Sequence, residues 1–172
     1  MYMVDSAILS NIDLNKVIAS HVESGKDITI LTIGAALYRA VDAAKELSEK
    51  YGMEAEIINI HSLVPLDYSK IVESVKKTGK VVLVSDACAR GSFMGEVARN
   101  ITELCFDDLD APPVVVGARN WITPPFEFDA DFFPQASWIL DAIHEKLVPL
   151  AGYENVNTCD EAETIRRAKL GV

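Results

Sequence analysis

The sequence predicts an α/β fold, a three-layer αβα sandwich around a mostly parallel sheet. Three observations support this fold class: four short runs rich in β-branched residues, a segment with helical spacing of apolar residues after each run, and glycine or proline at the junctions. Strands that alternate with helices form parallel sheets covered on both faces. The chain has 172 residues, 49% of them hydrophobic, which suits one domain.

The first strand–helix unit has the clearest pattern. Residues 28–33 (Ile-Thr-Ile-Leu-Thr-Ile) are almost continuously apolar, as expected for a strand buried on both faces, and Gly34 ends the run. A helix is then predicted from five apolar positions at helical spacing: Leu37, Ala40, Val41, Ala44 and Leu47. Gly52 stands just beyond this pattern, where glycine commonly ends a helix.

The same cycle repeats along the chain. Further strands are predicted at residues 55–60, 81–84 and 114–116. Asp67 is predicted to cap a helix that carries Ile71 and Val75 and ends at Thr78-Gly79. The two last helices are predicted from Val97, Ile101 and Leu104, and over residues 135–147.

We divide the chain into three parts: an N-terminal segment (1–24, a linker or packed arm), a domain (25–150) and a C-terminal tail (151–172). The N-terminal end carries only a weak amphipathic pattern and the C-terminal end has few apolar anchors, so we expect each to pack on the domain or on a partner. The long connection over residues 117–133 is rich in aromatic residues and proline, which is typical of a functional loop or of a loop packed against another part.

The net charge excludes some classes of function. With 16 basic and 26 acidic residues the chain carries a charge of −10, which disfavours nucleic-acid binding and a polybasic membrane anchor. No apolar run is long enough to span a membrane and no signal-peptide pattern is present, so we expect a cytoplasmic protein. The three cysteines form no Cys-x-x-Cys pair, which argues against the common zinc and disulfide frameworks.

Candidate reactive residues lie where strands of the predicted sheet end. His61 follows the second strand, Asp86 the third, and Cys88 comes two residues later. Ligands of such sheets favour the carboxyl ends of the strands. These three side chains suit a nucleophilic site, in which imidazole activates the thiol and the carboxylate orients the imidazole. Structural roles in a loop and a turn are the favoured interpretation, because spacing in the sequence fixes no mutual geometry of the three side chains.

Two other chemistries have weaker signals. A phosphorylatable Asp86 needs further carboxylates after the first strand to hold a divalent cation, and Ile33-Gly34-Ala35 supplies none. The turn from Gly91 to Gly95 opens a helix whose amides suit an anion, but Arg90 is the only nearby cation, so a glycine turn that lets the helix pack close to the sheet is the favoured interpretation. No dinucleotide fingerprint or P-loop is present.

Two segments are candidate interfaces. Aromatic residues crowd the region after the fourth strand: Trp121, Phe126, Phe128, Phe132, Phe133 and Trp138. They indicate either a subunit interface or a loop packed over its own domain. The acidic run Asp107, Asp108 and Asp110 suits a solvated surface or the docking of a basic partner.

Taken in order, several motifs resemble a known family. They are residues 25–30 with Ile33-Gly34, Asn-Ile-His-Ser-Leu-Val-Pro-Leu-Asp at 59–67, Asp86-Ala87 with residues 91–96, and Ile-Thr-Pro-Pro-Phe-Glu at 122–127 with Pro134. This order resembles the C-terminal domain of transketolase-like thiamine-diphosphate enzymes, and above all the beta subunit of 2-oxoacid (pyruvate, branched-chain or acetoin) dehydrogenases. The sequence departs from the family pattern at His61, Ser92, Met94 and Ile122, so the 2-oxo acid is not predicted.

The resemblance implies a mixed five-stranded sheet and a non-catalytic role. It implies that thiamine diphosphate and magnesium are bound elsewhere in the complete enzyme, and that this chain supplies no catalytic, cofactor-binding or metal-binding residue. The implied partners are the alpha subunit, a second beta subunit and the lipoyl acyltransferase core, and we expect a homodimer in isolation. The alternatives are a small stand-alone hydrolase-like α/β enzyme, or a ligand-binding regulatory module, either of which would use the strand ends at His61, Asp86, Cys88, Gly91 and Gly95.

Overall fold

A computed structural model describes residues 25–157, which form alternating strands and helices. The strands are β1 (Ile28–Thr32), β2 (Ala55–Asn59), β3 (Val81–Cys88) and β4 (Val114–Ala118). The helices are α2 (Ala36–Tyr51), α3 (Ser69–Thr78), α4 (Phe93–Cys105), α5 (Asp129–Phe132) and α6 (Ala136–Lys146). Two single 3₁₀ turns, η1 (Phe106–Asp108) and η2 (Phe126–Phe128), precede β4 and α5. No helix in this part of the chain is long and apolar enough to cross a bilayer.

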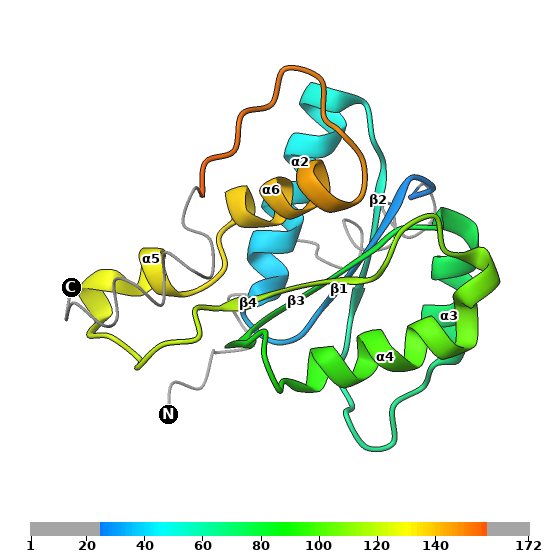
Figure 1. Cartoon of the computed structure of the whole chain (residues 1–172), viewed down its shortest axis with the longest axis horizontal. Helices are drawn as coiled ribbons and strands as arrows, with labels where there is room; N and C mark the ends of the chain where they lie inside the picture. Colours follow the sequence, from blue (N-terminus) through cyan, green and yellow to red (C-terminus); the bar gives the residue numbers. More distant parts are fainter. Residues whose placement is uncertain (1–24, 158–172) are drawn as a thin grey trace, which may run out of the picture.

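The strands form one parallel sheet in the order β2-β1-β3-β4. Helices α2 and α6 cover one face, and α3 and α4 cover the other (Figure 1). The predicted αβα sandwich is therefore confirmed. The residues described contain four strands, so the fifth strand that the family resemblance implies is not among them.

Strand β1 shows why both faces need cover. Ile28 and Ile30 point to the face under α2, while Leu31 belongs to the cluster beneath α3 and α4, and all three are fully buried. Side chains alternate along a strand, so a strand with helices on both sides must be apolar at nearly every position. This is the physical origin of the continuous apolar run at residues 28–33.

A buried polar network fastens α3 to the sheet. The hydroxyl of Thr29 in β1 lies 2.7 Å from those of both Ser74 and Thr78 in α3, and Ser74 donates to the Glu56 carboxylate of β2 at 2.6 Å. Lys77 neutralises Glu56 at 2.5 Å. Because every member has a partner, the polar groups under α3 are buried without the penalty of unsatisfied hydrogen bonds.

The helix limits agree closely with the sequence, with one shift. Gly52 ends α2 in the left-handed conformation with φ of 64°, as predicted. Asp67 lies one residue before the N-cap position, which Tyr68 occupies, yet the Asp67 carboxylate still accepts a hydrogen bond from the Ser69 amide at 2.9 Å. Asp67 thus satisfies an amide of the first turn of α3, which is the role that the sequence assigned to it.

Strand β3 bulges where it passes β4. Val84 pairs with Val116 and Cys88 with Ala118, so three residues of β3 lie opposite the single residue Gly117. A Cβ atom at Gly117 would overlap the carbonyl oxygen of Ala87 and lie 2.5 Å from the amide nitrogen of Ala89. Glycine is therefore required here by the close approach of two backbones, and the bulge directs the end of β3 into the loop before α4.

We predict that Gly117→Ala lowers the free energy of unfolding by about 1–3 kcal/mol, the usual cost of forcing extra atoms into a packed site. Gly95→Ala is the matched control, because a Cβ there would meet only ordinary contacts at 3.8 and 3.9 Å. A glycine-to-alanine change inside a helix should be neutral or stabilising by about 0.4–1 kcal/mol. Urea denaturation compares the two variants, and equal midpoints would contradict the close approach at Gly117.

Candidate functional site

The sheet order places its switch point between β1 and β3, because the chain runs outward to β2 on one side and to β4 on the other. Ligands of such sheets bind at the carboxyl ends of the strands beside this point. Here the Asp86 carboxylate, at the end of β3, accepts a hydrogen bond from the Arg39 guanidinium of α2 at 2.7 Å. This ion pair connects α2 to the end of β3 beside the switch point. The Asp86 carboxylate therefore already has a partner in its own chain.

The structure does not bring His61, Asp86 and Cys88 together as a catalytic triad would require. His61 follows β2, which β1 separates from β3, so about two strand spacings, roughly 9–10 Å, lie between the strand ends. The His61 ring is exposed and its Nε2 lies 3.4 Å from the Asn59 amide nitrogen. The Cys88 thiol donates to the Arg119 carbonyl at 3.3 Å. Each of the three side chains therefore has a structural partner of its own.

Polar groups of the turn from Gly91 to Gly95 also form hydrogen bonds within their own chain. Ser92 caps α4, and its hydroxyl oxygen accepts a hydrogen bond from the Gly95 amide at 3.2 Å while donating to the Ala89 carbonyl. The Gly95 amide, one of those that could bind an anion, is thus already hydrogen-bonded to Ser92. Across residues 25–157, no group of three His, Cys, Asp or Glu side chains is arranged to hold a metal ion.

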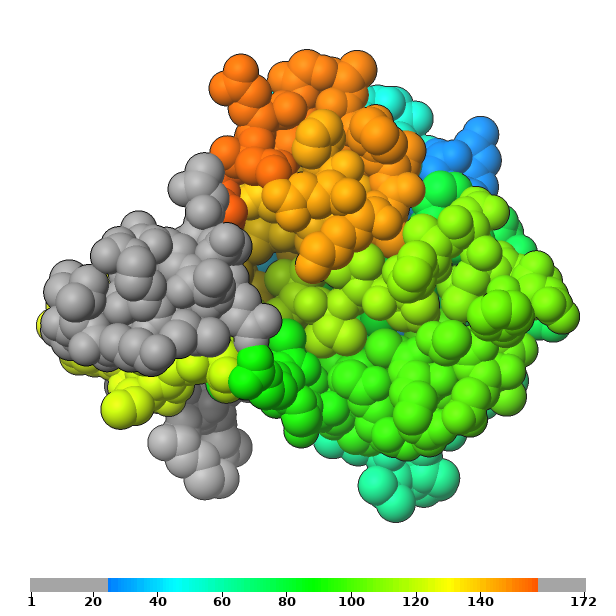
Figure 2. All heavy atoms as spheres, viewed as in Figure 1, coloured from blue at the N-terminus to red at the C-terminus, as the bar shows by residue number. Residues whose placement is uncertain are grey.

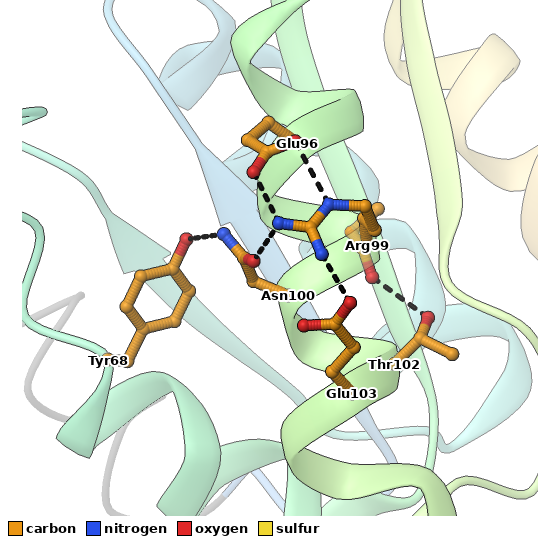
Figure 3. A network of polar contacts seen from close by, with 7 residues as sticks. Tyr68, Glu96, Arg99, Asn100, Thr102 and Glu103 are labelled. Carbon is orange, nitrogen blue, oxygen red and sulfur yellow. Dashed lines mark hydrogen bonds and ion pairs between the residues drawn. The ribbon is translucent and has the colours of Figure 1, made fainter.

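A network of exposed polar contacts lies on α4 (Figure 3). Arg99 donates to Glu96 and to Glu103, one turn away on either side, and to Asn100, which in turn donates to the Tyr68 hydroxyl at 2.7 Å. Hydrogen bonding to Arg99 lowers the pKa of Glu96. Because two carboxylates neutralise Arg99, the network stabilises the helix surface and does not offer a cation to a ligand.

A groove of about 630 Å³ runs along the outer edge of β4. Its walls come from β4, from α6 and from two asparagines of the following segment, Asn155 and Asn157. In Figure 2 it opens toward the viewer between the orange C-terminal segment and the yellow-green strand β4. Among the residues described, β4 pairs only with β3, so its peptide groups border this groove.

The side chain of Asp141 holds one wall of the groove in place. It is buried in α6, and its two carboxylate oxygens accept hydrogen bonds from the Tyr153 hydroxyl and from the amides of Val156 and Asn157, at 2.8–2.9 Å. Three donors satisfy the buried charge, and in return the carboxylate ties residues 153–157 to the helix.

The aromatic candidates divide into two groups. Phe132 is buried, Phe133 packs edge-on against it at 4.9 Å, and the half-buried Trp138 packs on the core. The others are exposed, together with a neighbouring isoleucine. We call these four residues the aromatic surface, with their exposed fractions in parentheses: Trp121 (37%), Ile122 (87%), Phe126 (83%) and Phe128 (54%). Phe132, Phe133 and Trp138 thus pack on their own domain, while an interface stays a prediction for the exposed residues.

The acidic run lies at the other end of the sheet. Residues 107–110 follow α4 and precede β4, so they lie at the amino ends of the strands, whereas the aromatic surface follows the carboxyl end of β4 (Figure 1). Asp108 pairs with Lys76 at 3.5 Å and Asp110 with Lys80 at 2.7 Å. The two candidate interfaces are therefore separate surfaces.

Sequence reasoning missed Arg39, Arg119 and Asp141. The signal for Asp141 was present, because it is a charged residue inside the apolar stretch Ile139, Leu140, Ala142 and Ile143. A charged side chain on a buried helix face needs hydrogen-bond partners, so its position predicts hydrogen bonds to another segment of the chain. Arg39 and Arg119 carry no such signal, since their partners are distant in sequence.

The sequence matches known proteins over most of its length. The profile described as "Transketolase, C-terminal domain" matches residues 18–139. The 2-oxoisovalerate dehydrogenase subunit beta of Bacillus subtilis is 46% identical over 51% of this chain and 27% of its own length. The mitochondrial 2-oxoisovalerate dehydrogenase subunit beta of Dictyostelium discoideum is 34% identical over 74% of this chain and 34% of its own.

Two further comparisons agree. The pyruvate dehydrogenase E1 component subunit beta of Rhizobium meliloti is 32% identical over 70% of this chain and 26% of its own length. A solved structure titled "Split gene transketolase, inactive beta4 tetramer" matches with a TM-score of 0.59 and 27% identity, over 72% of this chain and 39% of that one. The chain thus spans about a third or less of the curated relatives named here.

We predict that Tyr153 makes stability fall in alkaline solution. Burial, with the hydrogen bond to Asp141, raises the pKa of Tyr153 above its ordinary value near 10. The stabilisation is complete below pH 10 and is lost as pH rises further, because the unfolded chain releases the phenolic proton first. The free-energy difference between the wild type and Tyr153→Phe should therefore shrink above pH 10, by at most about 1.4 kcal/mol per pH unit. A pH-independent difference in urea denaturation would contradict this prediction.

Proposed function

Because the chain belongs to the transketolase C-terminal domain family, we propose that it is the assembly domain of the beta subunit of a thiamine-diphosphate-dependent 2-oxoacid dehydrogenase. The single observation that carries this proposal is the contrast between the two kinds of candidate residue. The polar groups at the strand ends bond to their own chain, while the aromatic surface is exposed.

The chemistry of the complete enzyme is assigned to parts outside this chain. The named relatives are beta subunits of 2-oxoisovalerate and pyruvate dehydrogenases. We propose that the complete cytoplasmic enzyme decarboxylates a 2-oxo acid oxidatively and transfers the acyl group to lipoyl. Thiamine diphosphate and magnesium would be bound by the alpha subunit and by the rest of the beta subunit.

We assign the aromatic surface to contact with a second beta subunit. Large aromatic side chains are enriched at the centres of subunit interfaces, and most oligomers are symmetric homo-oligomers. The structurally similar chain is titled a beta4 tetramer, which favours a second copy as the occupant. We assign docking of the lipoyl acyltransferase core to the acidic segment 107–110 at the opposite end, in which Asp108 and Asp110 also pair with Lys76 and Lys80 of this chain. The alpha subunit is the further partner that this proposal implies.

The full chain should self-associate through the aromatic surface. Burying a phenylalanine contributes about 1.5–3 kcal/mol, so Phe126→Ser should raise the dimer dissociation constant about tenfold or more in sedimentation equilibrium. Phe106→Ser is the control, because Phe106 is 74% exposed but lies at the amino ends of the strands. Its dissociation constant should match that of the wild type. A strictly monomeric wild-type chain, or equal effects of the two substitutions, would overturn the assignment.

The chain alone should neither bind the coenzyme nor turn over a 2-oxo acid. Titration with thiamine diphosphate and magnesium in a calorimeter should give no heat of binding, because both groups are proposed to lie in other parts of the enzyme and the Gly95 amide at the start of α4 already bonds to the Ser92 hydroxyl. Pyruvate and 2-oxoisovalerate, supplied with coenzyme and a dye as electron acceptor, should remain unconsumed. Saturable binding or steady dye reduction by the isolated chain would contradict the proposed role.

A further inference from the structure

Arg119 joins three segments that are distant in sequence. It follows β4 directly, and its Nε donates to the Asp131 carbonyl of α5 at 2.9 Å. Its Nη2 donates to the Asn157 side chain at 2.8 Å, and its guanidinium lies 4.4 Å from the centre of the Trp138 ring in α6. The backbone takes part as well, since the Arg119 amide donates to the Phe132 carbonyl at 3.0 Å.

These contacts lie at both ends of the loop that carries the aromatic surface. The loop leaves the sheet at Arg119 and returns at α5, where the side chain and the amide of Arg119 bond to consecutive carbonyls of residues 131 and 132. Between these points the chain contains only the single turn η2 as regular structure. Arg119 therefore closes the loop at its base, and the exposed aromatic residues belong to the closed part.

The same guanidinium also reaches the segment that Asp141 holds. Asn157 donates its amide to Asp141 and accepts from Arg119 through its side chain. The aromatic loop and residues 153–157 are thus attached to α6 through neighbouring contacts. A guanidinium suits this position because its planar fork bonds two acceptors and stacks on an aromatic ring at once, which an ammonium group does not.

We infer that Arg119 is the positioning residue that holds the aromatic loop and the segment 153–157 in one fixed arrangement, and so presents the aromatic surface in the form that a second copy of the chain binds. The inference rests on the proposed function. Association costs less free energy when the binding loop is ordered beforehand, and the contacts of Arg119 supply that order. Arg119 itself touches no reacting group.

The first test separates positioning from general stability by a double-mutant cycle. Arg119→Ala should raise the dimer dissociation constant about tenfold, equivalent to about 1.4 kcal/mol. In a Phe126→Ser background the same change should raise it by no more than about twofold, since the surface that Arg119 positions is already damaged. An equal effect of Arg119→Ala in both backgrounds would overturn the inference. Arg99→Ala, which removes the arginine of the α4 network, is the control and should leave the dissociation constant unchanged.

The second test does not need a dimer, so it distinguishes failure of the inference from failure of the proposed function. In amide NMR spectra of dilute wild-type and variant chains, Arg119→Ala should shift the resonances of residues 131–133 and of 156–157 together. Arg119→Lys should shift the same two groups, because lysine carries all its donors on one nitrogen atom, whereas Arg119 reaches Asp131 and Asn157 from two separate nitrogen atoms, Nε and Nη2. Shifts confined to one of the two groups, or a wild-type spectrum for Arg119→Lys, would contradict the inference that Arg119 holds both segments together. This holds even if the chain proves monomeric.

Discussion

The close contact between the backbones of β3 and β4 at Gly117 fixes the arrangement of the carboxyl end of the sheet. At Gly117 the two backbones lie too close for any side chain, and directly afterwards β3 turns toward α4 while β4 continues to Arg119. A parallel sheet offers its strand ends to solvent at one edge. Here this close contact determines where the loop that carries the aromatic surface leaves the sheet.

Beyond that contact, the polar groups at the strand ends form hydrogen bonds within the chain. The sheet has the switch point at which many α/β proteins bind substrates. The Asp86 carboxylate at this point accepts a hydrogen bond from Arg39 of α2. The Gly95 amide likewise donates a hydrogen bond to the hydroxyl of Ser92, which caps α4. Fold alone does not imply function, and in this chain the satisfied polar groups and the exposed aromatic groups together favour assembly over catalysis.

The sequence predicted the sandwich well because its strands and helices are specified locally. A run such as Ile28–Thr32 must be apolar on both faces, and Gly52 ends α2 by its own conformation. Contacts between distant segments could not be predicted in this way: nothing near Asp86 in the sequence identifies Arg39, and Phe132 and Phe126 have the same side chain although one is buried and the other exposed. The expectations for residues 1–24, for the tail beyond residue 157 and for Cys159 lie outside the described residues.

Copies of the chain are proposed to meet at the aromatic surface. Hydrogen exchange with mass spectrometry, at protein concentrations well below and well above the association midpoint, tests this contact. Peptides covering residues 119–130 should exchange more slowly at high concentration, while those covering residues 104–110 should not change. Concentration-dependent protection confined to residues 104–110, or protection nowhere, would contradict it.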